Sequence, residues 1–218
     1  MPKAQGKRDL NKVAIRGDIM SAAEEVFIEK GFRLAKMDEI AERSSITKRT
    51  LYKQYPSKVA LIFQLFERYL RTLEMSFTDG QESQQSPISI IRQNYKALFE
   101  FTKNNEKFMR LYWMVDSNEF EGEIPETLIK RVNMLNKKIF KLNKDAVEKS
   151  IASGAMIDVD PELLVHLLSA INKGIFIHAN KEKKFEIADI NPDEIFKLLE
   201  IILENGLYIE GKKEHLAK

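Results

Sequence analysis

Apolar residues recur every three or four positions along most of the chain, the spacing that collects them on one face of an α-helix. Ile19, Ala22, Ala23 and Val26 follow this rule near the start of the chain. Alternation of apolar and polar residues, which predicts β-strands, is not found over any useful length. The pattern predicts an all-α protein with helices at about residues 13–30, 37–44, 47–54, 58–78, 87–103, 106–115, 124–152, 161–180 and 192–206.

Capping residues and glycines predict where several of these helices begin and end. A capping side chain precedes proline, whose fixed φ and missing N–H suit a first helical turn, at Ser86-Pro87, Asp160-Pro161 and Asn191-Pro192. Four glycines follow apolar stretches and are predicted to end helices in a left-handed conformation: Gly31, Gly80, Gly154 and Gly206.

Composition narrows the possible classes of protein. With 218 residues, 44% of them apolar and 31% charged, the chain is typical of one or two globular domains. It has no cysteine, and its histidines, His166, His178 and His215, lack metal-binding spacing, so we predict no metal and no other cofactor. Neither a signal peptide nor a transmembrane stretch is recognisable, and we expect a cytoplasmic protein.

The net charge of +2 conceals an asymmetry along the chain. Residues 1–58 hold 13 lysines and arginines against 8 acidic residues, whereas the remainder holds 22 against 25. A basic first quarter favours an anionic partner, of which nucleic acid is the commonest, although charge alone is equally compatible with an ordinary solvated surface.

Residues 37–58 carry the pattern of a helix-turn-helix. Two short helical segments flank a compact turn at residues 44–46. Ile40 and Ala41 face inward from the first segment, Ile46 fills the turn and Leu51 anchors the second segment. Such a short pair needs these few apolar contacts because it has little surface of its own to bury.

The second segment presents side chains that suit the major groove of DNA. Thr47 is predicted to cap it, which places Lys48, Arg49 and Thr50 in its first turn and Tyr52 and Lys53 on its outward side. Two further residues, Tyr55 and Lys58, are expected nearer the DNA backbone as donors to phosphate oxygens. The alternative is a solvated basic helix in which Tyr52 and Tyr55 only pack.

The first quarter of the chain resembles the tetracycline-repressor (TetR) family of bacterial transcription regulators. The matching positions are Ile19-Met20, Ala22-Ala23, Phe27, Gly31-Phe32, Ile40-Ala41, Thr47-x-x-Thr50-Leu51-Tyr52, Tyr55, Ser57-Lys58 and Leu61. The resemblance implies a DNA-binding domain at residues 1–57 and a divergent effector-binding and dimerisation domain at residues 58–218. It also implies a subunit that dimerises through its last two helices.

Three places depart from the commonest form of that family. Ser45 stands where glycine is frequent, Tyr55 replaces a frequent phenylalanine, and Ala35 and Lys36 replace threonines before the second helix. Losing a capping hydroxyl typically costs about 1 kcal/mol. At position 36 a phosphate contact is still expected, made by the charge of the lysine.

A basic arm, made of Lys3, Lys7, Arg8 and Lys12, precedes the first predicted helix. Two alternatives stay open for it. Such arms follow the DNA backbone or enter a minor groove in other helix-turn-helix proteins, but more often they are disordered tails.

The middle of the chain predicts a cavity for a small apolar or aromatic effector. The segment 106–115 is apolar nearly all round and is therefore central. Ordinary core packing is the alternative for each side chain. The predicted lining is Phe66, Leu70, Tyr95, Phe99, Phe108, Met109, Tyr112, Trp113, Met134 and Phe140.

The last two helices carry more apolar surface than one core requires, which predicts a homodimer through a four-helix bundle. A buried hairpin within a monomer is the alternative. His166 and His178 fit structural roles better than a pH switch. The predicted interface residues are Leu163, Leu167, Ala170, Ile171, Gly174, Ile177, Ile195, Leu199 and Ile202.

Together these patterns predict a ligand-responsive, sequence-specific regulator, usually a repressor in the family it resembles, that binds a palindromic double-stranded DNA operator as a dimer. One alternative is a DNA-binding protein of the same fold that organises chromosomes. A small helical enzyme is disfavoured because phosphate-binding, nucleophile-elbow and metal-binding motifs are missing from the sequence.

Overall fold

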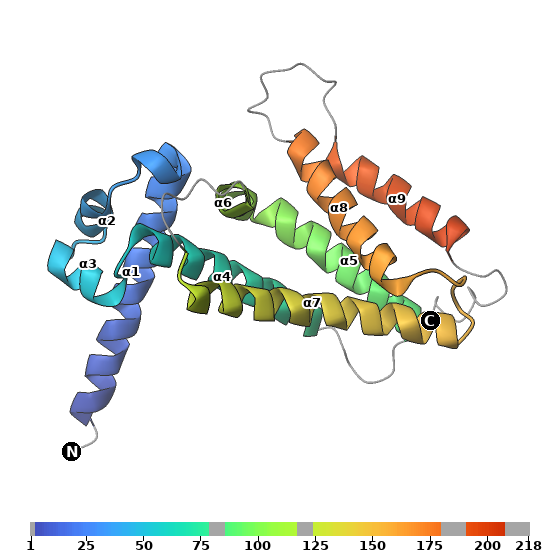
Figure 1. The fold of residues 1–218 in the computed structure, drawn as a ribbon, viewed down its shortest axis with the longest axis horizontal. Helices are drawn as coiled ribbons and strands as arrows, with labels where there is room; N and C mark the ends of the chain where they lie inside the picture. The colour runs from blue at the N-terminus through green and yellow to red at the C-terminus, as the bar shows by residue number, and fades with distance from the viewer. Residues whose placement is uncertain (1–2, 79–85, 117–123, 180–190, 208–218) are drawn as a thin grey trace. The chain divides into compact units, whose positions relative to one another are not determined.

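The computed structural model describes residues 3–78, 86–116, 124–179 and 191–207, and Figure 1 shows that they are predominantly helical. The predicted all-α fold is confirmed, with no β-structure in these ranges beyond a single bridge residue at Met156. The helices are α1 (Lys3–Leu34), α2 (Met37–Arg43), α3 (Lys48–Gln54), α4 (Lys58–Thr78), α5 (Pro87–Asn104), α6 (Glu106–Asp116), α7 (Glu126–Ala152), α8 (Pro161–Ala179) and α9 (Pro192–Gly206).

Only α1 departs from its predicted bounds by more than two residues. It begins at Lys3, ten residues before the predicted start. The prediction followed apolar periodicity, which the first dozen residues lack, yet those residues include good helix formers and no proline after Pro2. The backbone of the basic arm is therefore helical from Lys3, and its contact with DNA stays a prediction.

The three predicted caps before proline are confirmed. Ser86, Asp160 and Asn191 each accept a hydrogen bond from a backbone N–H two or three residues further on, at 2.8–3.3 Å. Each bond satisfies a donor that would otherwise lack a partner in the first turn.

The predicted glycine terminators have mixed outcomes. Gly31 and Gly154 adopt positive φ angles of 73° and 68°, a conformation that glycine reaches without steric cost. The prediction for Gly206 is wrong, because this residue is the last of α9 and the following Leu207 N–H still bonds to the Leu203 carbonyl. Gly80 lies outside the described residues.

Packing divides the chain into two compact units. Unit 1 comprises residues 1–70 and 106–134, and unit 2 comprises residues 71–105 and 135–218. Helices α4 and α7 each contribute their first part to unit 1 and the rest to unit 2. The functional division expected from the sequence, at residue 57, stays a prediction.

Unit 1 has an apolar core to which α1, α2, α3, α4 and α6 contribute. The predicted anchors of the helix-turn-helix, Ile40, Ala41 and Leu51, are buried in it. Packing these short helices against α1 supplies the burial that they lack alone. The side chains with no exposed surface in this unit are Ile19, Ala23, Val26, Phe27, Ile40, Leu51, Leu61, Ile62, Leu65 and Leu111.

Polar contacts attach α4 and α6 to α1 within unit 1. The carboxylate of Glu24, which is buried, accepts hydrogen bonds from the Tyr69 hydroxyl at 2.6 Å, from Arg68 at 2.9 Å and from Lys107 at 3.3 Å. Burial, together with this bond, raises the pKa of Tyr69 well above its usual value. One carboxylate of α1 therefore contacts residues of two other helices.

Charged side chains also fasten α2 to α1. The guanidinium of Arg43 donates to both carboxylate oxygens of Glu29, at 2.8 and 2.6 Å, and Lys30 donates to Glu39 at 2.7 Å. The hydrogen bond from Arg43 holds the pKa of Glu29 below its usual value. Because these groups are exposed, they orient the helices more than they stabilise the fold.

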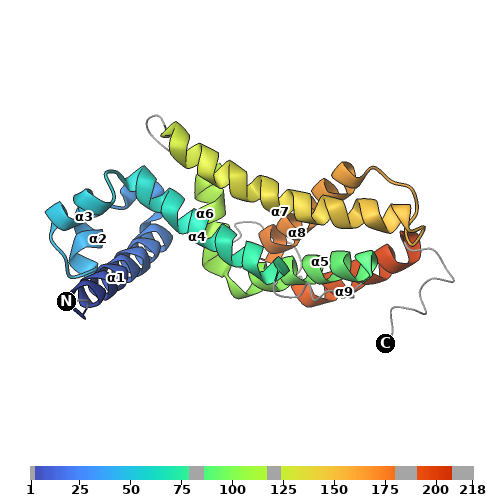
Figure 2. The ribbon, with the colours of Figure 1, turned by 90° about the horizontal axis from the view of Figure 1, so that it is seen from below.

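Unit 2 packs α5, α8 and α9 with the second part of α7, and Figures 1 and 2 show α8 crossing α5 and running beside α9. Its centre is aromatic, with the rings of Phe99 and Phe196 stacked at 4.2 Å and Tyr95 stacked on Phe196 at 5.5 Å. Near this core Asn172 donates to the Thr102 hydroxyl at 3.1 Å, which joins α8 to α5.

In the described part of the chain, none of the helices is both long and apolar enough to cross a membrane. The same residues contain no cluster of three or more side chains suited to holding a metal ion.

Candidate nucleic-acid interface

The turn between α2 and α3 is held by backbone and serine hydrogen bonds. The buried Ser44 hydroxyl donates to the Ile40 carbonyl at 2.6 Å, and the Ile46 N–H donates to the Ala41 carbonyl at 3.0 Å. Ser45 between them adopts a φ of 54°, in the left-handed region. This conformation explains why glycine suits the position, because a side chain there crowds the backbone.

Replacing Ser45 by glycine is expected to stabilise the protein by up to about 1 kcal/mol, because the left-handed strain is relieved. For a chain of this size the midpoint of thermal unfolding should rise by about 2–4 °C. Circular dichroism during heating would measure it. Ser44→Gly is the matched control and should lower the midpoint, since Ser44 has a negative φ of −87° and a bonded hydroxyl. A lower midpoint for Ser45→Gly would contradict the expectation.

Helix α3 is anchored by one face and exposed on the other. The buried Leu51 holds it to the core, and Thr47 caps it as predicted, accepting the Thr50 N–H at 3.2 Å. The two threonine hydroxyls also share a hydrogen bond of 2.9 Å. Of the predicted DNA contacts, those with exposed side chains are Lys36, Thr47, Lys48, Arg49, Tyr52 and Lys53, whereas Thr50, Tyr55 and Lys58 are partly buried.

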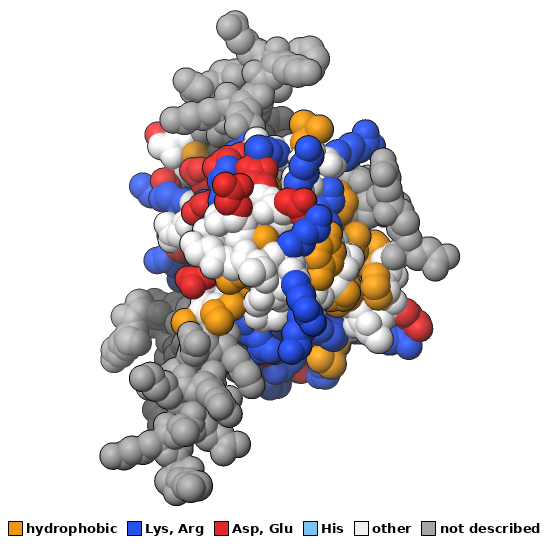
Figure 3. Space-filling model, turned by 90° about the vertical axis from the view of Figure 1, so that its left-hand side faces the viewer, with side chains coloured by type: hydrophobic (Ala, Val, Ile, Leu, Met, Phe, Trp, Pro, Cys, Tyr) orange, Lys and Arg blue, Asp and Glu red, His pale blue; other side chains and the backbone are white. Residues whose placement is uncertain are grey.

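The face that carries α2 and α3 is basic in its middle and lower part. Figure 3 shows lysine and arginine side chains gathered there and acidic side chains gathered toward the upper edge. No acidic residue occupies the first turn of α3, where the unpaired N–H groups of a helix favour negative charge. The exposed first turn therefore presents only groups that attract DNA.

Lys48 differs from its neighbours because it already has an anionic partner. Its amine lies 2.7 Å from one carboxylate oxygen of Asp38 and 2.9 Å from the other. The same amine lies 6.0 Å from the centroid of the Tyr52 ring. The hydrogen bond to Asp38 raises the pKa of Lys48.

Lys58 and Tyr55 are more engaged with the protein than the sequence suggested. The Lys58 amine donates to the carbonyls of Ala35 at 3.0 Å and Arg33 at 3.2 Å, and it lies 4.5 Å from the centroid of the Phe32 ring. Lys58 therefore joins the start of α4 to the last turn of α1 and to the segment that follows it. Burial raises the pKa of Tyr55. Phosphate contacts at both residues stay predictions.

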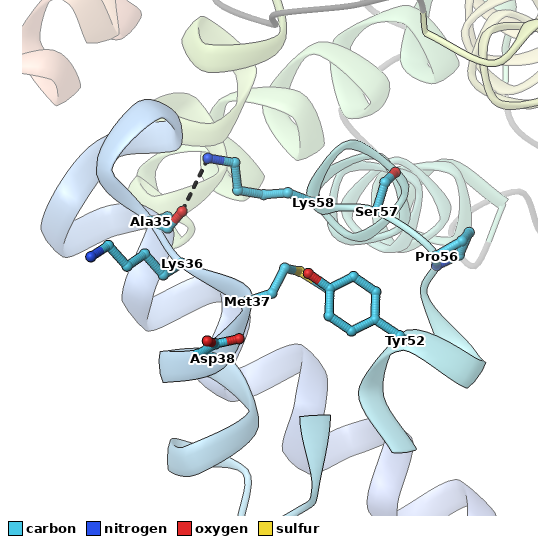
Figure 4. Close-up of a pocket in the computed structure, with 8 residues that line it drawn as sticks. All are labelled: Ala35, Lys36, Met37, Asp38, Tyr52, Pro56, Ser57 and Lys58. Atoms are coloured by element: carbon cyan, nitrogen blue, oxygen red, sulfur yellow. Dashed lines mark hydrogen bonds between the residues drawn. The ribbon is translucent and has the colours of Figure 1, made fainter. Parts of the chain in front are cut away.

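An open surface hollow of about 450 Å³ lies between the start of α2 and the start of α4. In Figure 4 the Tyr52 ring reaches across it toward Met37, and the Lys58 amine turns to the Ala35 carbonyl. Lys36 occupies the cap position of α2 without a side-chain cap. The hollow is lined by Ala35, Lys36, Met37, Asp38, Tyr52, Pro56, Ser57 and Lys58.

Asp38 is the charged group that the sequence analysis did not single out. An acidic residue in the first turn of a helix is common because it complements the helix dipole, so it carries no functional signal. Its partner Lys48 is ten residues away and on another helix. Only the angle between α2 and α3 brings the two together.

The predicted effector residues fall into two groups. In unit 1 the ring of Phe66 stacks on Phe108 at 5.6 Å, and Tyr112 lies 6.0 Å from Phe66. Leu70, Met109, Trp113 and Met134 belong to the same unit, but Trp113 and Met134 are exposed. In unit 2 Tyr95 and Phe99 are buried, and Phe140 packs 4.8 Å from the His166 ring.

The predicted interface residues differ in how far their side chains are exposed. Leu163, Leu167, Ala170 and Ile202 are exposed, and Ile171, Gly174 and Ile195 are partly buried. Leu199 is buried in the core of its own unit and is therefore not available to a second subunit. Leu198 and Ile201 on α9 are also more than half exposed. The side chain of Ile177 lies outside the described ones.

The family profile of the bacterial regulatory proteins of the tetR family matches residues 19–65, which span the helix-turn-helix just described. The chain belongs to the TetR family. This TetR-family protein is a DNA-binding, helix-turn-helix transcriptional regulator, and its family is not one of enzymes.

Similar proteins extend this assignment along the chain. It is 30% identical over 101 residues to the transcriptional activator FasR of Mycolicibacterium smegmatis, a match that covers 46% of each chain. It is 22% identical over 190 residues to the regulator YhgD of Bacillus subtilis, covering 87% of this chain and 94% of that one. The chain thus matches about half of FasR and nearly all of YhgD.

The fold of this TetR-family regulator also resembles solved structures. The crystal structure of a candidate transcriptional regulator from Saccharomonospora viridis in complex with choline superposes with a TM-score of 0.71. The sequence identity is 15%, and the match covers 89% of this chain and 98% of that one. At this identity the likeness concerns the fold.

Proposed function

We propose that this TetR-family regulator binds a palindromic operator as a homodimer and acts as a repressor that a small effector releases. The single observation that carries the proposal is the exposed, capped first turn of α3. Lys48 and Arg49 project there from a helix that Leu51 fixes to the core. Lysine and arginine donors on such a helix can bind guanine O6 and N7 in the major groove.

An exposed apolar face on α8 and α9 supports the dimer. Leu163 and Leu167 lie one turn apart on α8, and Leu198, Ile201 and Ile202 lie together on α9. All five are more than half exposed in the single chain. A contiguous apolar face of this kind is typical of an interaction site, and a second copy presenting the same face would cover it.

The aromatic side chains support an effector with apolar or aromatic character. The centre of unit 2 holds Tyr95, whose buried hydroxyl has no hydrogen-bond partner in the described structure. Such a group favours a ligand that offers one hydrogen-bonding atom beside its apolar surface. The S. viridis structure holds choline, and that ligand belongs to that protein.

We propose that α4 carries the response from effector to operator. Its first part contacts α1 through Arg68 and Tyr69, which both bond to Glu24. A shift of α4 would therefore move the helix-turn-helix and change the separation of the two reading helices. Linkage requires effector and operator to weaken each other by the same factor, a coupling of typically 1–3 kcal/mol.

Selection from random DNA duplexes tests the proposal. The protein should enrich an inverted repeat whose half-sites lie about 34 Å, one helical turn, apart, because two-fold symmetry presents two equivalent helices. Enrichment of no sequence, or of a single asymmetric site bound by one chain, would overturn it.

A further inference from the structure

Asp38 places a carboxylate on the surface that is proposed to bind DNA. It holds the amine of Lys48 at 2.7 Å, and both side chains are well exposed, at 64% for Asp38 and 59% for Lys48. An exposed pair of this kind contributes little to the stability of the fold, because water screens the attraction between the two charges. Glu39 complements the dipole of α2 as well as Asp38 does, so neither the helix dipole nor the stability of the pair requires a carboxylate next to Lys48.

The other exposed cations that are predicted to contact DNA have no such partner. Arg49 and Lys53 on α3 and Lys36 before α2 form no ion pair within 4.0 Å in the part of the chain that the structure describes. Lys48 is thus singled out among four exposed cations. The pair also joins α2 to α3, and the same amine lies 6.0 Å from the centroid of the Tyr52 ring.

The carboxylate affects contacts with phosphates and with bases differently. To bind a phosphate, Lys48 must exchange one anion for another, and Asp38 would then face that phosphate as a like charge. To bind guanine, the ammonium can keep one N–H on Asp38 and donate its other two to the neutral acceptors O6 and N7. The pair therefore disfavours contacts with the backbone and permits contacts with base edges.

We propose that Asp38 is a specificity-determining residue, because its ion pair with Lys48 disfavours binding of the lysine to phosphates and permits its binding to base edges. The inference rests on the proposed recognition of an operator by α3. It predicts that the carboxylate weakens binding to unrelated DNA more than it weakens binding to the operator, and so raises the ratio between the two affinities.

Asp38→Asn tests the inference, because it removes the charge and keeps the shape. Glu42→Gln is the matched control, since Glu42 lies one turn further along α2, is exposed and forms no ion pair within 4.0 Å among the described residues. Affinities for the selected operator and for a scrambled duplex are measured over a range of salt concentrations. A second pair of proteins, Lys48→Gln with and without Asp38→Asn, isolates the contribution of the amine.

Asp38→Asn should raise the affinity for the scrambled duplex about three- to tenfold at low salt and should change operator affinity less than twofold. The slope of log affinity against log salt for the scrambled duplex should steepen by about 0.9 per subunit, the value for one added phosphate contact. Glu42→Gln should change the affinities for both duplexes equally, without steepening the slope against salt. In the Lys48→Gln background, Asp38→Asn should behave like Glu42→Gln.

Equal effects of Asp38→Asn and Glu42→Gln on both duplexes would overturn the inference while leaving operator recognition intact. Loss of operator affinity alone in Asp38→Asn would also overturn it, because the carboxylate would then be needed for the specific contact. If the wild-type protein preferred no duplex, the proposed function would fail first, and this inference with it.

Discussion

Replacing Leu167 and Ile202 together by glutamate is expected to convert a dimer into monomers. Both side chains are more than half exposed in the single chain, so the substitutions should leave the fold of each subunit intact. In the proposed four-helix bundle, however, they would bury four carboxylates in an apolar interface. Uncompensated burial of charge costs several kcal/mol per group, which exceeds what such an interface can supply.

Sedimentation equilibrium at micromolar concentration would measure the change in mass. Operator affinity should fall at least about 100-fold, because each half-site would be bound separately and the effective concentration of the second reading helix would be lost. Ile129→Glu is the matched control: Ile129 is also exposed but lies on α7 in unit 1, and this variant should stay dimeric. A wild-type monomer, or a double variant that still dimerises, would contradict the proposal.

The second large effect is expected from Arg49→Ala. A bidentate contact between arginine and a base contributes about 1–3 kcal/mol of discrimination, and a symmetric dimer makes the contact twice. Operator affinity should therefore fall by about 30-fold or more, and preference at one base pair of each half-site should disappear. Because the Arg49 side chain is exposed and forms no described ion pair, the fold should not change.

Lys36→Ala provides the comparison for this experiment. Lys36 is exposed at the cap position of α2, where a phosphate contact is predicted. Its replacement should therefore weaken the affinity for all DNA sequences alike and make the salt dependence of binding shallower. Lys58 is less suitable, because its amine also bonds to the carbonyls of Arg33 and Ala35. Equal weakening of operator and scrambled duplexes by Arg49→Ala would show that Arg49 contacts only phosphate.

The helices and the capped, exposed first turn of α3 could be predicted from local signals. The Thr47 cap, the Leu51 anchor and the three caps before proline each depend on residues within a few positions of one another, so sequence spacing reports them directly. The early start of α1 was missed because a charged, solvated helix lacks the apolar periodicity from which helices are predicted. Gly206 was misassigned because glycine after an apolar stretch is common at helix ends but does not require a positive φ.

The pairing of side chains from different helices could not be predicted from the sequence. Asp38 meets Lys48, Glu24 meets Tyr69 and Lys107, and Lys58 folds back to the Ala35 carbonyl across 23 residues. Each contact depends on the angle and distance between two packed helices, which local propensity does not encode. The same reason separates Leu199, buried in its own core, from its exposed neighbours Leu198 and Ile202 on the same apolar helix.

The order of the helices in the described ranges, the helix-turn-helix and its basic first turn follow from residue spacing alone, because helical periodicity and capping are local properties of the chain. Which cations are available to DNA and which apolar side chains are exposed to a partner emerged only from packing. The reason is that contacts in the folded protein decide which side chains can bind a partner. Lys48 is paired with Asp38 of another helix, and Leu199 is buried in the core of its unit, but neither contact can be read from the sequence.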